Sequence, residues 1–500
     1  MRESKSFRII LSFFSVLFIA LSIVIFVSER RSYVIKTNIY PQGSSINGVP
    51  LGGLDRSQAA ERLNSVFSLP IELRYNGARM QFLPAELGFS VNIEESLDEL
   101  EKDNATTTYW AHLWGKPGNS NTQSDLISHL DTQMLINFLN TTISPRYDQP
   151  PSEPLAIIGT TNFEPGQGGM TLSKEDAVEM IEAGLASIDQ RIIDLPVSVE
   201  SSLPLRSENL TIFLKQIIGL EQFDGLVEIY LEDLEGELDL QLAVKNYENV
   251  IPDAAFSAGS TIKIPIMVSV LKRSPEPTSE DMLALLERMI VLSENPPADA
   301  LMSRYIDADF GPLFVTDDLQ ALQYPNSFLA GYFAIGSPLL RLYKTPAYSR
   351  TDVFLDPDIY NQTVPSEIGD LLAQIYRCAN PEFGQSKLEQ VFGNEISKSE
   401  CQTMLDLLSK NQIGMLVEAG LPPEGSFAHK HGWTTELDGL IHSISDVGIV
   451  SSPSGDYVLT IFMHTEDQLI FDSANWLFAK LSQSIYNAFN LDDQTYWWIE

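Results

Sequence analysis

The longest apolar stretch of the chain lies close to its N-terminus, at residues 9–27, and contains no charged residue. A helix of this length spans about 28 Å, close to the ~30 Å hydrocarbon core of a bilayer. The pattern predicts a transmembrane anchor within residues 1–31. Arg2, Lys5 and Arg8 precede it, which favours a cytoplasmic N-terminus and an extracytoplasmic bulk.

A cleavable signal peptide is the alternative interpretation of the same stretch. Such a peptide has a shorter apolar core followed by small residues at the cleavage site. Here Ile25, Phe26 and Val27 occupy that place, so an uncleaved anchor in the cell membrane is expected. No second apolar run of this length follows.

A short stalk is expected at residues 32–43. Between residues 44 and 205, one pattern of apolar and polar residues occurs twice. Each time a glycine pair opens a segment with helical spacing of apolar residues, and a short apolar strand follows. Polar residues suited to capping stand at both helix starts. Two α+β units of the same design are predicted, with helices over 55–63 and 173–185 and strands over 69–73 and 195–199.

From residue 206 to residue 500 the pattern predicts a larger α+β domain. Strand patterns come first and last in this region, with a helix-rich stretch at 257–418 between them. This order predicts one antiparallel sheet built from both ends of the domain, with a helical subdomain packed against it. The expected strands are 226–231, 238–244, 439–450 and 456–464, and a final helix is expected at 473–489.

Composition narrows the functional classes. The formal net charge of −35, from 67 acidic and 32 basic residues, disfavours nucleic acid as a partner. The two cysteines, Cys378 and Cys401, lack the spacing of a thiol redox or zinc site. They form either one disulfide in an oxidising compartment or two buried thiols.

The first chemical motif is Ser260-Thr261-Ile262-Lys263, at the start of an apolar helical pattern. At this spacing Ser260 and Lys263 share one helix face. A serine becomes a nucleophile when a base lies within hydrogen-bond reach, and a lysine of depressed pKa can be that base.

Two further motifs follow in order. Ser293-Glu294-Asn295 offers a second hydroxyl for proton transfer and an amide that can orient the lysine. Lys430-His431-Gly432-Trp433 opens the closing strands. Lys430 is expected to attract a substrate carboxylate, Gly432 to allow close approach of substrate, and the Trp433 N–H to complete an oxyanion hole with that of Ser260.

These three motifs resemble the S-x-x-K, S-D-N and K-T-G elements of class A β-lactamases and penicillin-binding proteins. The resemblance covers residues 206–490. It implies Ser260 as acylated nucleophile, Lys263 as general base with Ser293, and Asn295, Lys430, His431, Gly432 and Trp433 as substrate-binding residues. No cofactor is implied, and the scattered histidines indicate no metal site.

The sequence also departs from that family. His431 replaces the usual Thr or Ser of the third motif, and residues 295–366 contain no Glu to activate a deacylating water. An acyl-enzyme is therefore expected to turn over slowly, which favours a DD-peptidase-like hydrolase.

Residues 44–204 resemble the peptidoglycan-binding domains found beside vancomycin-resistance W-type domains in bacterial envelope proteins. The combined prediction is a membrane-anchored serine hydrolase acting on a β-lactam or a peptidoglycan stem peptide, with glycan contact by the N-terminal region. The alternative is a non-catalytic wall-binding protein with a degenerate hydrolase domain.

Overall fold

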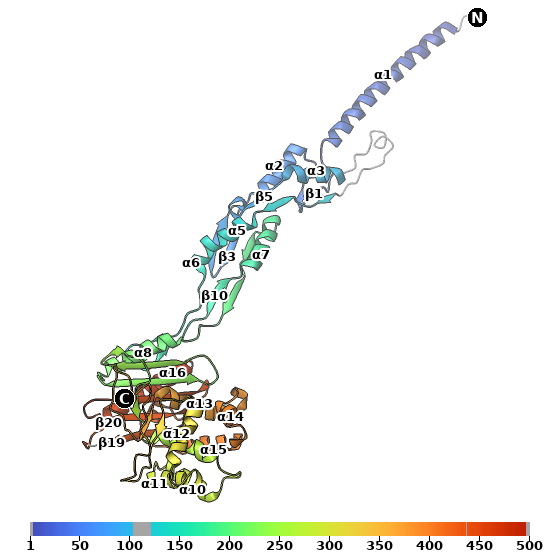
Figure 1. The fold of residues 1–500 in the computed structure, drawn as a ribbon. Helices are drawn as coiled ribbons and strands as arrows, with labels where there is room; N and C mark the ends of the chain where they lie inside the picture. Colours follow the sequence, from blue (N-terminus) through green and yellow to red (C-terminus); the bar gives the residue numbers. More distant parts are fainter. Residues whose placement is uncertain (1–3, 104–121, 437, 497–500) are drawn as a thin grey trace. The chain divides into compact units, whose positions relative to one another are not determined.

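The computed structural model describes residues 4–103, 122–436 and 438–496, which form two compact units (Figure 1). The first unit is Met1–Ser152 with Gly168–Ser202, and the second is Glu153–Gln167 with Leu203–Glu500. Residues 153–167, which we expected in the N-terminal region, therefore pack within the second unit.

Helix α1 (Ser4–Thr37) contains the apolar stretch. Its segment Ile9–Val34 has a mean hydropathy of 2.9 and is exposed, so it is long and apolar enough to cross a membrane, as a signal sequence would also be. The helix continues into the expected stalk at residues 32–43. Beyond it Tyr40 is buried in the core of the first unit, so the end of that segment is part of a folded body.

Helix α2 (Arg56–Phe67) begins where its capping residues predict. The Asp55 carboxylate accepts the Gln58 backbone N–H, and the Gln58 side chain accepts the Asp55 N–H. This reciprocal capping box satisfies two donors that a helix start leaves free.

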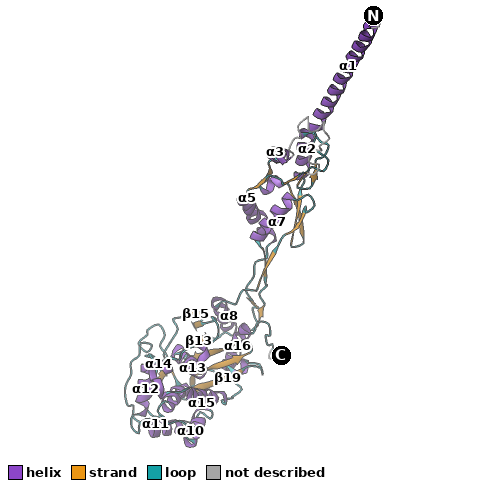
Figure 2. Cartoon of the chain, turned by 90° about the vertical axis from the view of Figure 1, so that its right-hand side faces the viewer, coloured by secondary structure: helices purple, strands orange, loops and turns teal. Residues whose placement is uncertain are grey.

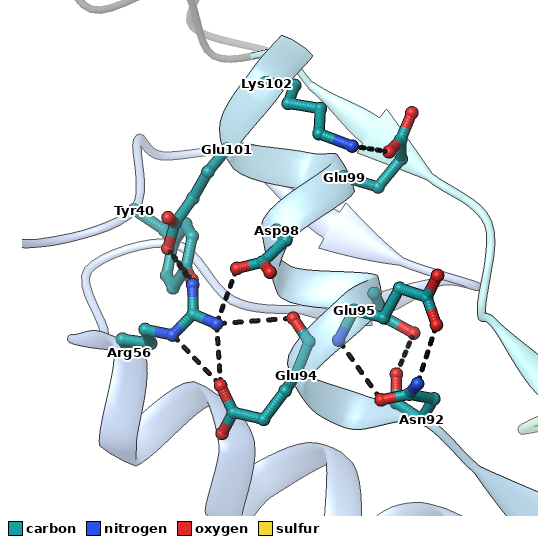
Figure 3. Close-up of polar contacts among 10 residues, drawn as sticks. Tyr40, Arg56, Asn92, Glu94, Glu95, Asp98, Glu99, Glu101 and Lys102 are labelled. Atoms are coloured by element: carbon teal, nitrogen blue, oxygen red, sulfur yellow. Dashed lines mark hydrogen bonds and ion pairs between the residues drawn. The ribbon is translucent and has the colours of Figure 1, made fainter.

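Helix α3 (Ile93–Asp103) is joined to α2 by one guanidinium group (Figure 3). Arg56 contacts Glu94, Asp98 and Glu101 of α3 at 2.6–2.9 Å. The Tyr40 hydroxyl donates to Glu101 at 2.8 Å, which ties the segment after α1 to the same cluster. The charged side chains are 38–72% exposed, so these ion pairs contribute little to stability.

A three-stranded sheet joins the two patterns that we expected to be separate units. Strand β3 (Ile71–Tyr75) pairs with β4 (Ala78–Phe82) and, in parallel, with β11 (Ile192–Asp194), which follows α7 (Lys174–Ala186). The internal repeat stays a prediction. The remaining described strands and α-helices of this unit are β1 (Ser45–Ile46), β2 (Val49–Pro50), β5 (Phe89–Val91), β6 (Gln123–Ser124), β7 (Ser128–Leu130), α5 (Thr132–Phe138), α6 (Ser144–Tyr147), β10 (Gly169–Leu172) and β12 (Val197–Glu200).

The second unit is built on a six-stranded antiparallel sheet of order β15-β14-β13-β21-β20-β19. Strands from the two ends of the unit meet where β13 pairs with β21. Strand β19 lies at an edge. The bounds are β13 (Leu226–Asp233), β14 (Leu240–Lys245), β15 (Glu248–Asn249), β19 (Ser426–Thr435), β20 (Ile441–Ser452) and β21 (Gly455–His464).

Helices cover both faces of this sheet (Figures 1 and 2). Along β21, Leu459 and Ile461 pack with α8 (Ser207–Leu220) and α16 (Phe471–Phe489). The alternating Val458 and Phe462 face the opposite core, which contains α13 (Pro365–Ala379). Because successive strand residues point to opposite faces, apolar residues at nearly every position bury the sheet on both sides.

The helical subdomain follows the first strands. Its helices are α9 (Lys263–Leu271), α10 (Glu280–Ile290), α11 (Asn295–Tyr305), α12 (Gly311–Ala321), α14 (Lys387–Phe392) and α15 (Lys398–Ser409). A disulfide between Cys378 of α13 and Cys401 of α15 settles the alternative that the sequence left open. Both cysteines are fully buried.

Residues 153–167 form a small hairpin, β8 (Leu155–Ala156) with β9 (Phe163–Glu164), beside helix α16. The buried Thr161 hydroxyl donates to Gln483 of α16 at 2.7 Å, and the Phe163 ring packs against Phe213 of α8. These contacts hold the hairpin inside the core of the second unit.

Candidate active site

Ser260 lies in a tight turn between a strand and a helix. Strand β16 (Phe256–Ser257) pairs with β18 (Asn361–Thr363), which pairs in turn with β17 (Phe328–Leu329). The Asn361 side chain accepts the Gly259 N–H at 2.9 Å and fixes the start of the turn. Ser260 belongs to a short 3-10 turn, η3 (Gly259–Ile262), and the helix expected from Ser260 begins only at Lys263.

Lys263 is the centre of the site. Its fully buried side chain places Nζ 3.0 Å from Ser260 Oγ, 2.7 Å from the Ser293 carbonyl oxygen and 2.8 Å from Asn295 Oδ1. Burial lowers the pKa of Lys263 to about 8, against the opposing attraction of Asp299. A neutral lysine has two N–H groups, which the carbonyl and the amide oxygen accept. Its lone pair is then left for the proton of the Ser260 hydroxyl.

The second wall is the junction of α10 and α11. Ser293 has a φ of 58°, an unusual conformation for a non-glycine residue, and this turn aims its carbonyl at Lys263. Asn295 is the first residue of α11. Glu294 forms an ion pair with Arg288 instead of joining the site. Within this motif, the Ser293 carbonyl and the Asn295 side chain point toward Lys263, and the Glu294 side chain points away from it.

Asp299 is a site residue that our sequence analysis did not identify. It lies one turn after Asn295 on α11 and accepts the backbone N–H groups of Phe333 and Ala334 at 2.8 and 2.9 Å. Burial raises its pKa. The Phe333 ring centroid lies 5.5 Å from Lys263 Nζ, so Asp299 holds an aromatic ring against the lysine. The i, i+4 spacing of Asn295 and Asp299 was the available signal.

Strand β19 forms the third wall. A Cβ placed on Gly432 would lie 3.1 Å from Ala258 O and 3.2 Å from Thr261 Cγ2, so the strand backbone runs directly against the Ser260 turn. Gly259 and Gly432, together with Trp433, line one small pocket. This contact places the backbone of β19 beside the nucleophile, as an oxyanion hole requires.

Lys430 is fully buried on the same strand, and its Nζ donates to the His431 carbonyl at 3.1 Å. Burial, followed by repulsion from Lys263, lowers the pKa of Lys430 to about 7. When protonated, Lys430 adds a positive charge close to Lys263, which attracts an anion.

His431 has different contacts from those we expected. Its ring stacks on Trp433 at 4.5 Å, and its Nδ1 lies 3.5 Å from Asn411 Nδ2. Burial, then repulsion from Lys430, lowers the pKa of His431 to about 2, so the ring is neutral. Because side chains alternate along a strand, Lys430 and Gly432 share one face, while His431 and Trp433 share the other. The His431 ring therefore supports the strand from behind.

The described residues contain no group of three or more His, Cys, Asp or Glu side chains that could hold a metal ion. The buried His429 lies 2.6 Å from Asp446 and 3.9 Å from Glu418, and these three side chains do not form such a group.

Comparison with known proteins agrees with the architecture of the second unit. The model of the beta-lactamase enzyme family matches residues 273–489, so the C-terminal region has a beta-lactamase-like fold. The matched range begins after Ser260 and Lys263. No curated protein matches the sequence.

Several solved structures are similar to the chain. A structure of PBP-A shares 19% identity and has a TM-score of 0.40, covering 58% of this chain and 98% of its own. A class A beta-lactamase from Bacteroides cellulosilyticus DSM 14838 shares 15% identity, with a TM-score of 0.40 and coverage of 58% and 100%. The TLA-1 extended spectrum beta-lactamase shares 16%, with a TM-score of 0.39 and coverage of 56% and 98%.

Proposed function

We propose that this protein is a membrane-anchored serine hydrolase that forms an acyl-enzyme on Ser260. The observation that carries the proposal is the set of contacts of Lys263, whose Nζ reaches Ser260 Oγ, the Ser293 carbonyl and Asn295 Oδ1 at 2.7–3.0 Å. A buried lysine with a lowered pKa and two fixed acceptors is suited to take the serine proton.

The reaction follows from these positions. Ser260 Oγ attacks the carbonyl carbon of an amide or lactam while its proton passes to Lys263 Nζ. The N–H groups of Ser260 and Trp433 stabilise the oxyanion. As the intermediate collapses, the C–N bond breaks. The proton passes from Lys263 Nζ to the leaving nitrogen, with the Ser293 hydroxyl as the relay. Water then cleaves the Ser260 ester and releases the acid.

The substrate we infer is a β-lactam or the stem-peptide amide of peptidoglycan. The buried Lys430 supplies a positive charge for a carboxylate next to the scissile bond. The side chain held against Lys263 by Asp299 is the Phe333 ring, which cannot activate water. We therefore expect fast acylation and slow hydrolysis of the ester, as in a DD-peptidase-like enzyme.

The location we propose follows from helix α1. With the N-terminus in the cytoplasm, the helix crosses the cell membrane once and the remaining chain lies outside, where peptidoglycan is accessible. The first unit is then the part of the chain that contacts the glycan.

Labelling with a fluorescent penicillin tests the acyl-enzyme. The full chain in detergent should become covalently labelled, and Ser260→Ala should abolish the label. Ser303→Ala, which removes a hydroxyl that donates to the Ala300 carbonyl of the same helix, is the matched control and should label normally. Labelling that persists for hours supports slow deacylation.

Other outcomes separate the alternatives. Rapid loss of the label with hydrolysis of nitrocefin would identify a true β-lactamase. Absence of both Ser260-dependent labelling and esterase activity in a folded protein would contradict the proposal and favour a non-catalytic wall-binding protein.

A further inference from the structure

A long loop lies between two strands of the small sheet beside the nucleophile. After β17 ends at Leu329, no helix or strand interrupts the described chain until β18 begins at Asn361. Ordered loops of this length in a compact domain usually have a binding role. The loop is held to the sheet, because Tyr343 stacks on Phe328 at 5.0 Å and the Leu340 N–H donates to Ala330 at 2.8 Å.

Contacts near both ends of the loop reach the candidate active site. Near its start, Asp299 binds the backbone of Phe333, whose ring faces Lys263. Near its end, Arg350 donates to the carbonyl oxygens of Ile251 and Pro252, each at 2.7 Å. That segment leads within a few residues into β16 and Ser260. The loop is therefore fixed to the segment that precedes β16, and its Phe333 ring lies beside Lys263.

The charge of this part of the chain is opposite to that of the rest. Residues 319–351 contain no Asp or Glu, in a protein with 67 acidic residues and a net charge of −35. Arg341 and Lys344 are exposed there. Arg341 contacts Tyr343, and among the described residues no carboxylate pairs with Arg341 or Lys344.

Apolar side chains accompany these cations. Ile335 is fully exposed and Leu342 is 63% exposed. The surface formed by residues 335–344, which we call the cationic loop, thus combines two exposed cations, for which the described residues supply no carboxylate partner, with exposed apolar groups on a fixed backbone. An extended chain bearing carboxylates and small apolar side chains fits this chemistry, because opposite charges orient the chain and apolar contacts hold it.

We propose that the cationic loop binds an anionic peptide portion of the substrate, away from the scissile bond. This inference rests on the proposed acyl transfer at Ser260 and adds a substrate class, which is a carboxylate-bearing peptide. Binding energy from this remote part of the substrate would help to orient the scissile carbonyl at Ser260.

Two ester substrates with the same scissile bond test the inference. One is an N-succinyl dipeptide ester, which carries a free carboxylate remote from the scissile bond, and the other is its N-acetyl counterpart. The double variant Arg341→Gln/Lys344→Gln in the full chain should lower the second-order acylation rate with the succinyl ester about fivefold at low salt. The rate with the acetyl ester should change less than about twofold. Half-molar salt should reduce the difference, because screening weakens exposed charge pairs.

The matched control removes the same two charges elsewhere. Arg62→Gln/Lys398→Gln replaces two exposed cations outside the loop, so it should leave both acylation rates unchanged. Equal effects of the loop variant on both esters, no effect on either, or the same effect from the control variant would overturn the inference. Ser260-dependent acylation by the acetyl ester would still stand in each case, so this failure is distinguishable from failure of the proposed function.

Discussion

A methyl group on Gly432 would lie 3.1 Å from the carbonyl oxygen of Ala258, so the edge strand has no room for a side chain against the nucleophile turn. The same methyl would lie 2.9 Å from Ser445 Oγ on the neighbouring strand. The candidate active site therefore requires a glycine at this position, where the backbone of β19 packs directly against the Ser260 turn.

Gly432→Ala should separate β19 from the Ser260 turn. Because misplacement of reacting groups by about 1 Å can cost 10²-fold in rate, we expect the acylation rate to fall about 10- to 100-fold. Stopped-flow labelling would measure the fall. Gly219→Ala is the control, since a methyl there meets no atom within 4 Å and helix α8 should tolerate it. An unchanged acylation rate in Gly432→Ala would contradict the close packing.

The pH dependence of acylation should report on Lys263. Its pKa is lowered to about 8, so the neutral base becomes populated as the pH rises through that value. With an uncharged ester the acylation rate should increase from pH 6 to pH 9 with a midpoint near 8. Asn295→Ala removes an acceptor of the ammonium form and should shift this midpoint. A rate independent of pH would argue against Lys263 as the base.

A substrate carboxylate should add a second pH limb. Lys430, whose pKa is lowered to about 7, loses its charge as the pH rises, so binding of an anionic substrate should weaken above pH 7. Acylation by a carboxylate-bearing substrate should therefore follow a bell-shaped profile, while the uncharged ester shows only the rising limb. Lys430→Met should abolish the difference between the two profiles.

Glu228 should make the stability of the protein depend on pH. Its carboxyl is buried on β13, accepts the N–H groups of Asp253 and Ala254 at 2.8 and 3.0 Å, and has a pKa raised from 4.5 to about 8 by burial. A raised carboxyl pKa favours folding below pH 4.5, and this contribution is lost as the pH rises to 8. The slope is at most about 1.4 kcal/mol per pH unit.

The variant Glu228→Gln removes this titration. The free energy of unfolding of the wild type, measured relative to the variant by urea denaturation, should decrease between pH 5 and pH 8. A constant difference across that range would mean that Glu228 keeps an ordinary pKa.

Loss of the disulfide should destabilise the second unit. The Cys378–Cys401 bond closes a loop of 23 residues between α13 and α15, for which the chain-entropy model gives about 3 kcal/mol. Cys378→Ala/Cys401→Ala should lower the melting temperature, and a reducing agent should lower that of the wild type but not of the variant. Equal melting temperatures would indicate that the bond contributes little.

Local chemistry explains what the sequence could predict. The Asp55 and Gln58 capping box and the i, i+3 spacing of Ser260 and Lys263 each depend on residues within one helical turn. The strand patterns likewise depend on alternation within short segments. Each of these features lies within a few consecutive residues, so it can be recognised in the sequence without knowledge of the tertiary fold.

Contacts between distant segments explain what was missed. Asn361 fixes Gly259 from 102 residues away, and Asp299 binds Phe333 34 residues further along the chain. Neither pairing has a local signal, because whole helices and strands separate the two partners along the chain. The substrate-binding role expected of His431 stays a prediction. Strand alternation alone predicts that His431 and Lys430 point to opposite faces.

The hairpin at residues 153–167 gives the chain an unusual course, since the polypeptide passes between the two units three times before the second unit is complete. A gene fragment starting at Leu203 would omit Thr161 and Phe163, and with them the partners of Gln483 and Phe213. No single breakpoint yields both halves intact. Recombination or fusion can therefore exchange the two units only if residues 153–167 are kept with the second unit, although they are encoded within the first.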